Sequence, residues 1–478
     1  MKGVRGIWMG LGGLAVALAG CVSAPTPPSV SVPWAPPAEA RTSAGSWQEL
    51  RAQQPDFGRP LALAELADLA LQNNPASRQA WSEARIAAAQ VEQARGIFLP
   101  AVTAVGAGSR QYKSSDPAAL NQDYLQYGPS LQLNYLIFNI GGGYSAAVEQ
   151  ALQTVYAADY AFNRAIQSVL LAVETAYYGV VGAQAGVEAA ETSRKDAQTV
   201  LEAARTRVAQ GVGTELDVLQ AQAALDQAAY VLASAQGAVK TAHAALTQAL
   251  GAPADAPVKI VAPKDALPAA PAEEQLTKMI DAALERRPDI AALRARLAAS
   301  EASVRVAGAA QWPSLYLNGR VGHNDSDVWA GENMMTKSED FYGAGLSLEW
   351  TIFDGFRTAS AKRAARAQSD AVRSQLRQAE VAASADVWNG MQRYATALEK
   401  FAASEAFLRS SQAAYGLALD GYQAGLRSVL DLLTAESQSA QARSQQIAAR
   451  LEALTALANL AFATGELEKG AAGAAPAQ

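Results

Sequence analysis

The chain has 478 residues, of which 50% are hydrophobic and 18% charged, and its formal net charge is −6. This composition excludes an intrinsically disordered chain, and the absence of any Lys/Arg cluster argues against a nucleic-acid partner. Two histidines and one cysteine leave almost no material for His/Cys metal sites or histidine-dependent triads, so we expect no enzyme, metal or cofactor.

Residues 1–20 are typical of an export signal, with two basic residues before an apolar stretch from Ile7 to Ala19. The chain's only cysteine, Cys21, follows small residues, an arrangement that resembles the lipobox of bacterial lipoproteins. We therefore expect Cys21 to be the lipid attachment site, although an ordinary secretory signal is the alternative. Lipoproteins retained at the inner membrane typically carry Asp after the cysteine. Val22 stands there instead and favours an anchor in the outer membrane.

Prolines divide the rest of the chain. They gather in residues 21–60, which we expect to form an extended strap, and again in a linker at 253–272. Residues 130–252 and 314–475 contain none and are free to form long helices. The last segment, 467–478, is rich in Ala and Gly and is expected to be a flexible tail.

The two halves of the chain are similar to each other at an offset of 213 to 215 residues, which predicts an internal duplication with repeats at 61–252 and 273–466. The matched segments are Leu71–Pro75 with Leu284–Pro288, Leu99–Pro100 with Trp312–Pro313, Tyr127–Asn139 with Tyr342–Asp354, and Gly211 and Asp217 with Gly425 and Asp431.

Each repeat contains a long heptad pattern. From Gly143 to Gln210, apolar residues recur every seven positions, and small residues follow them three positions later, as Val148, Val155 and Phe162 with Ala151, Ala158 and Ala165 show. A helix of roughly 66 residues would be about 100 Å long, too long for a compact globular domain. The pattern predicts supercoiled helices packed side by side, with a fibrous dimeric coiled coil as the alternative.

Four segments alternate apolar and polar residues: about 100–110, 127–138, 313–322 and 341–353. Each is long enough for a tilted transmembrane strand, and aromatic residues gather at the ends, as expected at a lipid interface. Two soluble hairpins would fit the alternation equally well. In a membrane, four strands are too few to close a barrel, so several chains would have to contribute strands to one barrel.

These features resemble the TolC-like outer-membrane efflux family, in its lipoprotein branch. The motifs are the duplication, Ile352-Phe353-Asp354-Gly355, and Tyr422-Gln423-Ala424-Gly425 followed by Val429–Leu433. The resemblance implies a mainly α fold with transmembrane β-strands: a homotrimer whose twelve-stranded β-barrel continues into a periplasmic barrel of twelve helices.

The implied function is that of a passive exit duct in the outer membrane. It would dock with a periplasmic adaptor and an inner-membrane pump in an efflux or type I secretion system. The alternative is a lipid-anchored periplasmic coiled-coil protein without a pore.

The resemblance also places a gate at the periplasmic helix tips. Turns at Gly211, Gly213 and Gly425 would reverse the chain, with Thr214 and Ser428 capping the outgoing helices. Asp431, with Asp217 as its counterpart, would form a ring of carboxylates, and a link between Tyr422 and Arg427 would hold the gate closed. Both acids could also be helix-start residues favoured by the helix dipole. A second acidic position of the family is Thr434 here, and Gln220 in the first half, so we expect a less charged ring.

The segment containing His323, Met334 and Met335 offers a tempting metal site. Adjacent methionines point in different directions, however, and no third ligand is nearby. We expect this segment to be an extracellular loop.

Overall fold

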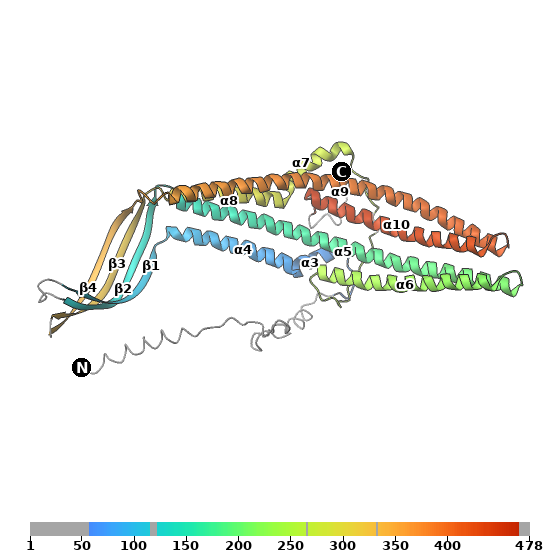
Figure 1. Ribbon diagram of the computed structural model, residues 1–478, viewed down its shortest axis with the longest axis horizontal. Helices are drawn as coiled ribbons and strands as arrows, with labels where there is room; N and C mark the ends of the chain where they lie inside the picture. The colour runs from blue at the N-terminus through green and yellow to red at the C-terminus, as the bar shows by residue number, and fades with distance from the viewer. Residues whose placement is uncertain (1–56, 115–121, 264–265, 331–332, 468–478) are drawn as a thin grey trace. The chain divides into compact units, whose positions relative to one another are not determined.

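A computed structural model describes residues 57–114, 122–263, 266–330 and 333–467 (Figure 1). The expected signal sequence, the expected lipid attachment site Cys21, most of the expected strap and the tail from residue 468 lie outside the described residues.

The same series of elements occurs twice. The first series is α3 (Leu63–Asn73), α4 (Pro75–Arg95), η2 (Gly96–Phe98), β1 (Ala101–Lys113), β2 (Gln122–Asn139), α5 (Gly143–Ala209) and α6 (Glu215–Ala249). The second is η4 (Glu273–Gln275), α7 (Leu276–Arg286), α8 (Pro288–Ala309), β3 (Ser314–Ala330), β4 (Asn333–Glu349), α9 (Arg357–Gln423) and α10 (Val429–Thr464). The predicted fold class, long duplicated helices with four strands per chain, is confirmed.

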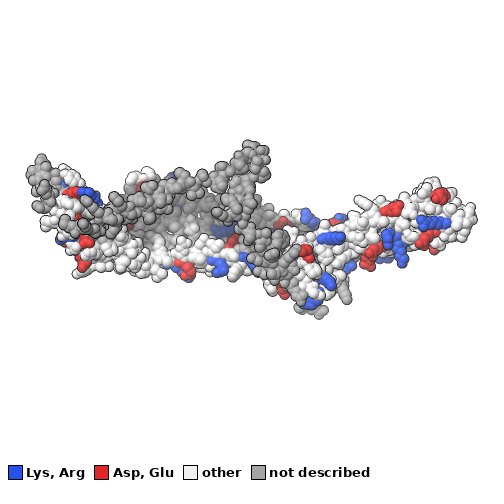
Figure 2. Space-filling model, turned by 90° about the horizontal axis from the view of Figure 1, so that it is seen from below, with Lys and Arg blue, Asp and Glu red and all other residues white. Residues whose placement is uncertain are grey.

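The two long helices, α5 and α9, have 67 residues each and form the framework of the helical part. Helix α5 packs against α4, α6, α8 and α10, and α9 packs against α8 and α10. Small residues line these contacts: Ala197, Ala204 and Ala383 are fully buried. Because a side chain of one carbon lets helix axes approach closely, the heptads of small residues produce side-by-side packing (Figure 1). Basic and acidic side chains are interspersed along the face shown in Figure 2.

The shorter helices meet end to end beside the long ones: the end of α6 meets the start of α4, and the end of α10 meets the start of α8. Asn74, before Pro75, donates from its side-chain amide to the carbonyl of Ala249 at the end of α6, at 2.9 Å. In the second repeat, Arg287 stands before Pro288 and donates to the carbonyl of Ala463 near the end of α10, at 3.4 Å. Proline at the first helical position needs no hydrogen-bond acceptor for its nitrogen, so both helices begin at this point. The junctions therefore interrupt α6/α4 and α10/α8 while α5 and α9 run past unbroken.

The strands form one antiparallel sheet in the order β1-β2-β3-β4. Leu131 lies opposite Ala104 of β1 and Val321 of β3, and Val321 lies opposite Tyr342 of β4. Because side chains alternate between the two faces of a strand, these rungs give one face an apolar row. Tyr342 is 89% exposed in the single chain, so nothing described covers this face.

The strands extend further than the sequence predicted, to 18 residues in β2 and 17 in each of β3 and β4. His323, Met334 and Met335 lie in strands, so the expected loop is wrong. The extra rungs carry polar side chains that pair across strands, as Arg110 does with Asp123 at 2.6 Å. The backbone ladder continues where the apolar alternation stops, and the alternation was the only signal available in the sequence.

At its other end β4 is shorter than predicted and stops at Glu349, which pairs with Ser314. The next partner would be Pro313, which has no N–H for the ladder. Trp350 instead donates its indole N–H to the carbonyl of Gln311 at 3.0 Å. The alternation in β2 also breaks, because the register shifts between Leu136 and Phe138.

Candidate gate at the helix tips

The two tips are the turns that join α5 to α6 and α9 to α10, and their backbones are nearly the same. Gly211 and Gly425 have φ angles of 76° and 77°, the left-handed region that favours glycine at a helix end. The N–H of Gly211 bonds to the carbonyl of Val208 at 2.9 Å, and that of Gly425 to the carbonyl of Tyr422 at 3.0 Å. All three predicted turn glycines, Gly211, Gly213 and Gly425, therefore lie where the chain reverses.

Asp217 and Asp431 take part in helix caps. The N–H of Asp217 donates to the hydroxyl of Thr214, and the N–H of Asp431 to that of Ser428, both at 3.2 Å. In return the Asp217 carboxylate accepts from the N–H of Thr214 at 3.0 Å, and Asp431 accepts from the N–H of Ser428 at 3.2 Å. Reciprocal bonds of this kind close the first turn of a helix.

The cap also affects the charge of Asp431. The hydroxyl and the backbone N–H of Ser428 donate to its carboxylate and lower its pKa below the ordinary value. Asp431 is exposed, whereas Asp217 is half-buried. A charged, exposed carboxylate is thus present at the second tip even though its local hydrogen bonds serve the cap.

Tyr422 occupies the centre of the contact between the tips. Its side chain is 2% exposed and packs in a cluster with Val200, Leu201, Ala221 and Leu432. The phenol oxygen has no hydrogen-bond partner among the described residues. Burial, followed by the nearby charge of Asp217, raises the pKa of Tyr422.

Arg207 of α5 joins the two tips, which the sequence did not predict. Its guanidinium carbon lies 4.7 Å from the centroid of the Tyr422 ring, and Nη1 donates to the Tyr422 carbonyl. Nη2 donates to the carbonyl of Val212 in its own tip at 3.3 Å. One side chain therefore bridges the end of α9 and the first turn, and we call this contact the Arg207–Tyr422 clasp.

Arg427, the expected partner of Tyr422, is exposed. Its backbone N–H donates to the carbonyl of Gly421 at 3.2 Å, and its guanidinium forms no hydrogen bond or ion pair with Tyr422. The Tyr422–Arg427 link is therefore not formed within one chain, and it stays a prediction for contacts between chains. Thr434 bonds to the carbonyl of Leu430 of its own helix at 2.8 Å.

A sequence signal for the clasp did exist. At an offset of 214 residues, Arg207 matches Gly421 and Gly213 matches Arg427, so arginine and glycine exchange places between the tips. A Cβ atom on Gly213 would lie 2.9 Å from the nitrogen of Val208, and one on Gly421 would lie 2.8 Å from Cγ of Arg427. The tight turn has room for a side chain at only one of the two positions.

A second charged group lies further along the helices. Asp196 of α5 pairs with Arg443 of α10 at 2.8 Å, and Glu436 of α10 lies buried beside them. Burial, with a further contribution from the charge of Asp196, raises the pKa of Glu436 to about 7. Tyr415 of α9 donates its hydroxyl to the carbonyl of Asp196 at 3.3 Å. This group fixes α5 against the second hairpin.

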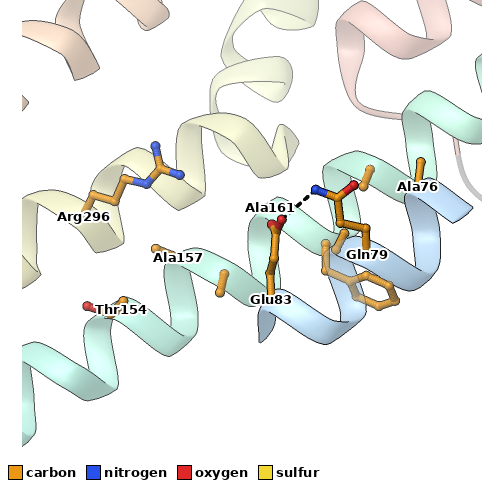
Figure 3. Close-up of a pocket in the computed structure, with 11 residues that line it drawn as sticks. Ala76, Gln79, Glu83, Thr154, Ala157, Ala161 and Arg296 are labelled. Atoms are coloured by element: carbon orange, nitrogen blue, oxygen red, sulfur yellow. Dashed lines mark hydrogen bonds between the residues drawn. The ribbon is translucent and has the colours of Figure 1, made fainter. Parts of the chain in front are cut away.

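A cavity of about 420 Å³ lies along α5 where α4 and α8 leave it uncovered (Figure 3). Alanines provide most of its lining, including Ala157 and Ala161, and Arg296 projects toward it from α8. Glu83 already accepts from Gln79 at 2.9 Å. These features describe a groove between helices, without converging groups for catalysis or ligand binding.

The helix hairpins with an appended strand pair in each repeat match a known family. The family model described as outer membrane efflux protein matches residues 66–252 and 279–466. The chain belongs to the outer membrane efflux protein family. The resemblance deduced from the sequence is thereby confirmed. As a member of this family the chain is an outer-membrane efflux channel located in the cell outer membrane. The family consists of channels, which are not enzymes.

Individual members of the outer membrane efflux protein family agree over most of their length. Protein CyaE of Bordetella pertussis is 31% identical over 413 residues, covering 85% of this chain and 84% of that protein. The probable efflux pump outer membrane protein TtgC of Pseudomonas putida is 27% identical, covering 84% and 83%. The crystal structure of the outer membrane protein VceC of Vibrio cholerae has the same fold, with a TM-score of 0.71 at 22% identity over 88% of this chain and 98% of that one.

Proposed function

We propose that three copies of the chain form a passive exit duct, in which one β-barrel crosses the outer membrane and continues into a tube of periplasmic helices. The observation that carries the proposal is the sheet. It has an apolar face, and each of its edge strands, β1 and β4, pairs with one neighbour only among the described residues.

Free edges decide between a barrel and an isolated sheet. An unpaired backbone group costs several kcal/mol in hydrocarbon, so a lipid-exposed sheet has to close. Four strands cannot close around an interior, whereas β4 of one copy can pair with β1 of the next. Three copies, the number implied by the family resemblance, give twelve strands.

The tips supply a surface for partners. Val212, Leu216 and Leu219 of the first tip and Leu426 and Leu430 of the second are exposed apolar side chains, and Leu426 is 82% exposed. Contiguous exposed apolar residues mark interaction sites. We assign this surface to the helices of a periplasmic adaptor, which connects the duct to an inner-membrane transporter of an efflux or type I secretion system. The transporter supplies the energy, and a lipidated Cys21 anchors each chain.

The tips also carry the proposed gate. Asp217 and Asp431 place one carboxylate from each tip near the axis of a trimer, and like charges around a pore attract cations and influence its opening. The exposed guanidinium of Arg427 is available for contacts between subunits that keep the tips together. The hydroxyl of Tyr422 is buried within the chain and has to become accessible before an Arg427 of another subunit can reach it.

The test compares neighbouring residues on opposite faces of β4. Leu346 lies on the apolar face, whereas Ser347 lies on the other face. A lysine in the lipid costs about 2–4 kcal/mol near the bilayer midplane, whereas the lumen tolerates charge. We expect the wild type and Ser347→Lys to run as heat-sensitive trimers on a gel and to conduct ions across planar bilayers, and Leu346→Lys to insert poorly.

A wild-type protein that is folded and lipidated but never conducts would support the alternative of a coiled-coil protein without a pore. Equal insertion of the two lysine variants would show that the apolar face does not meet lipid.

A further inference from the structure

The second face of the sheet, opposite the apolar one, is mainly polar. Across the middle rungs it carries small or uncharged polar residues, namely Thr103, Gln132, Asn134, Asn318, Gly343, Gly345 and Ser347. In a closed barrel whose apolar face meets lipid, this face lines the lumen. Where the other residues of this face are uncharged, one charged side chain determines the sign of the local potential.

Arg320 is that charge. It lies in β3 between Gln132 of β2 and Gly343 of β4, on the face opposite to Val321. Its guanidinium carbon is 5.7 Å from the centroid of Phe341, which belongs to the same face. Its side chain is exposed and forms no ion pair with a described residue.

A glycine makes room for the Phe341 ring. A Cβ atom on Gly322 would lie 2.7 Å from Cζ of Phe341 and 2.7 Å from the carbonyl oxygen of Pro129. The ring thus covers Gly322, while a Cβ atom on Gly343 would meet nothing within 4 Å. Arg320 is supported by an aromatic surface on one side and faces open space on the other, which suits a cation directed at passing solutes.

Carboxylates on the same face are too distant to neutralise Arg320. Glu349 pairs with Ser314, six residues along β3 and therefore about 20 Å away. Glu339 lies opposite Asn324, about 13 Å away, and is already paired with Lys337. Both separations exceed the screening length of about 8 Å at physiological salt. The other charge on this face, Lys113 at the outer end of β1, is also positive.

We infer that Arg320, contributed once by each subunit, forms a ring of positive charge midway along the barrel lumen and favours the passage of anionic cargo. The inference rests on the proposed trimeric duct. Fixed charges of one sign on the wall of a pore concentrate ions of the opposite sign. The cargo class that this ring favours is small molecules bearing carboxylate, sulfonate or phosphate groups.

The experiment measures the reversal potential of single channels under a potassium chloride gradient. The variants are Arg320→Gln, Arg320→Lys and the matched control Arg110→Gln, which removes the same charge from the outer face of the sheet. We expect the permeability ratio of potassium to chloride to rise about twofold in Arg320→Gln. Arg320→Lys keeps the charge and should behave as the wild type does, as should Arg110→Gln. Because variants are compared in one protein, the acidic tips contribute equally to each.

A second readout is block by citrate added on the barrel side. Citrate should block the wild type and Arg320→Lys more strongly than Arg320→Gln. Channels that conduct normally but show the same permeability ratio and citrate block with and without Arg320 would overturn the inference. Complete absence of channels in the wild type would instead refute the proposed duct, so the two failures are distinguishable.

Discussion

The first and second tips share their backbone and differ in the side chains that the backbone carries. Both have a left-handed glycine, a hydroxyl cap and an aspartate that closes the cap. The first tip has Arg207 and Gly213 where the second has Gly421 and Arg427, and Val208 stands where the second has Tyr422.

The difference shows how two copies of one structural element acquire different contacts. The turn leaves room for one arginine per tip, and its position decides where the guanidinium reaches. From position 207 it reaches the ring and carbonyl of Tyr422 within the chain. From position 427 it faces solvent in the single chain. The arginine of the first tip therefore joins the two hairpins of a chain, whereas the arginine of the second tip makes no such ring or carbonyl contact with the described residues of the single chain and is available to the subunit contacts proposed above.

Removing the clasp should have the largest effect. In Arg207→Ala the ring of Tyr422 loses a stacked cation worth about 1–2 kcal/mol, and its carbonyl loses a charged donor. The second hairpin should then separate more easily from the first, and single-channel conductance should rise about twofold or more.

The control for the clasp is Arg205→Ala, which removes an exposed arginine of the same helix turn. Its conductance should match the wild type, and Arg207→Lys should fall between the two. Unchanged conductance in Arg207→Ala would show that the clasp does not restrain the tip.

Neutralising the two acids separately should have a smaller effect. Asp431→Asn removes the exposed carboxylate but keeps an oxygen that can accept from Ser428, so the cap survives. We expect hexaamminecobalt(III) added on the periplasmic side to block this variant about tenfold more weakly than the wild type. Asp217→Asn should weaken the block less, because Asp217 is half-buried. Equal block of the wild type and the two variants would show that neither carboxylate lies at the pore entrance.

The smallest expected effect concerns pH and the helices beyond the tips. Gln222 of α6 matches Glu436 of α10, so Glu436→Gln makes the second hairpin resemble the first. The pKa of Glu436 is raised from 4.5 to about 7, so its contribution to stability is fully present below pH 4.5 and is lost as the pH rises through 7. At pH 8 the variant should therefore melt a few degrees above the wild type, and at pH 4.5 the two should melt together.

Glu405→Gln, an exposed change in α9, serves as the control for this pH series. The Asp196–Arg443 pair, which lies against Glu436, is intact in every variant of the series. A melting temperature that falls equally with pH in the wild type and in Glu436→Gln would assign the slope to other groups.

The sequence predicted the repeats, the long helices, the sheet and the turn glycines because each leaves a local pattern. Heptads identify α5, and alternation identifies which face of β3 and β4 is apolar. The outer rungs were missed because Asp123, Asp325 and Asp327 interrupt that alternation although the backbone ladder continues. The end of β4 depends on Pro313, a residue on the neighbouring strand, so the pattern of β4 alone could not reveal it.

In the candidate site, too, the features formed by neighbours in sequence were predicted and those formed by distant residues were not. Thr214 and Ser428 were recognised as caps because a cap is formed by neighbours in sequence. The Arg207–Tyr422 clasp joins residues 215 positions apart, and nothing near Arg207 identifies its partner. The only sequence signal for the clasp is the exchange of arginine and glycine between the halves. The reason for that exchange is the limited space in the turn, which the sequence does not show.

The end-to-end junctions at Asn74 and Arg287 have a mechanical consequence. The helical part of each chain has four rows, and two of them, α4 with α6 and α8 with α10, are interrupted at these junctions. Hydrogen bonds to the carbonyls of Ala249 and Ala463 connect the two helices of each interrupted row. Tilting the α5/α6 and α9/α10 tips relative to α4 and α8 thus requires bending only α5 and α9, because the broken rows can hinge. The level of Asn74 and Arg287 is therefore where the helical part of the chain bends most easily.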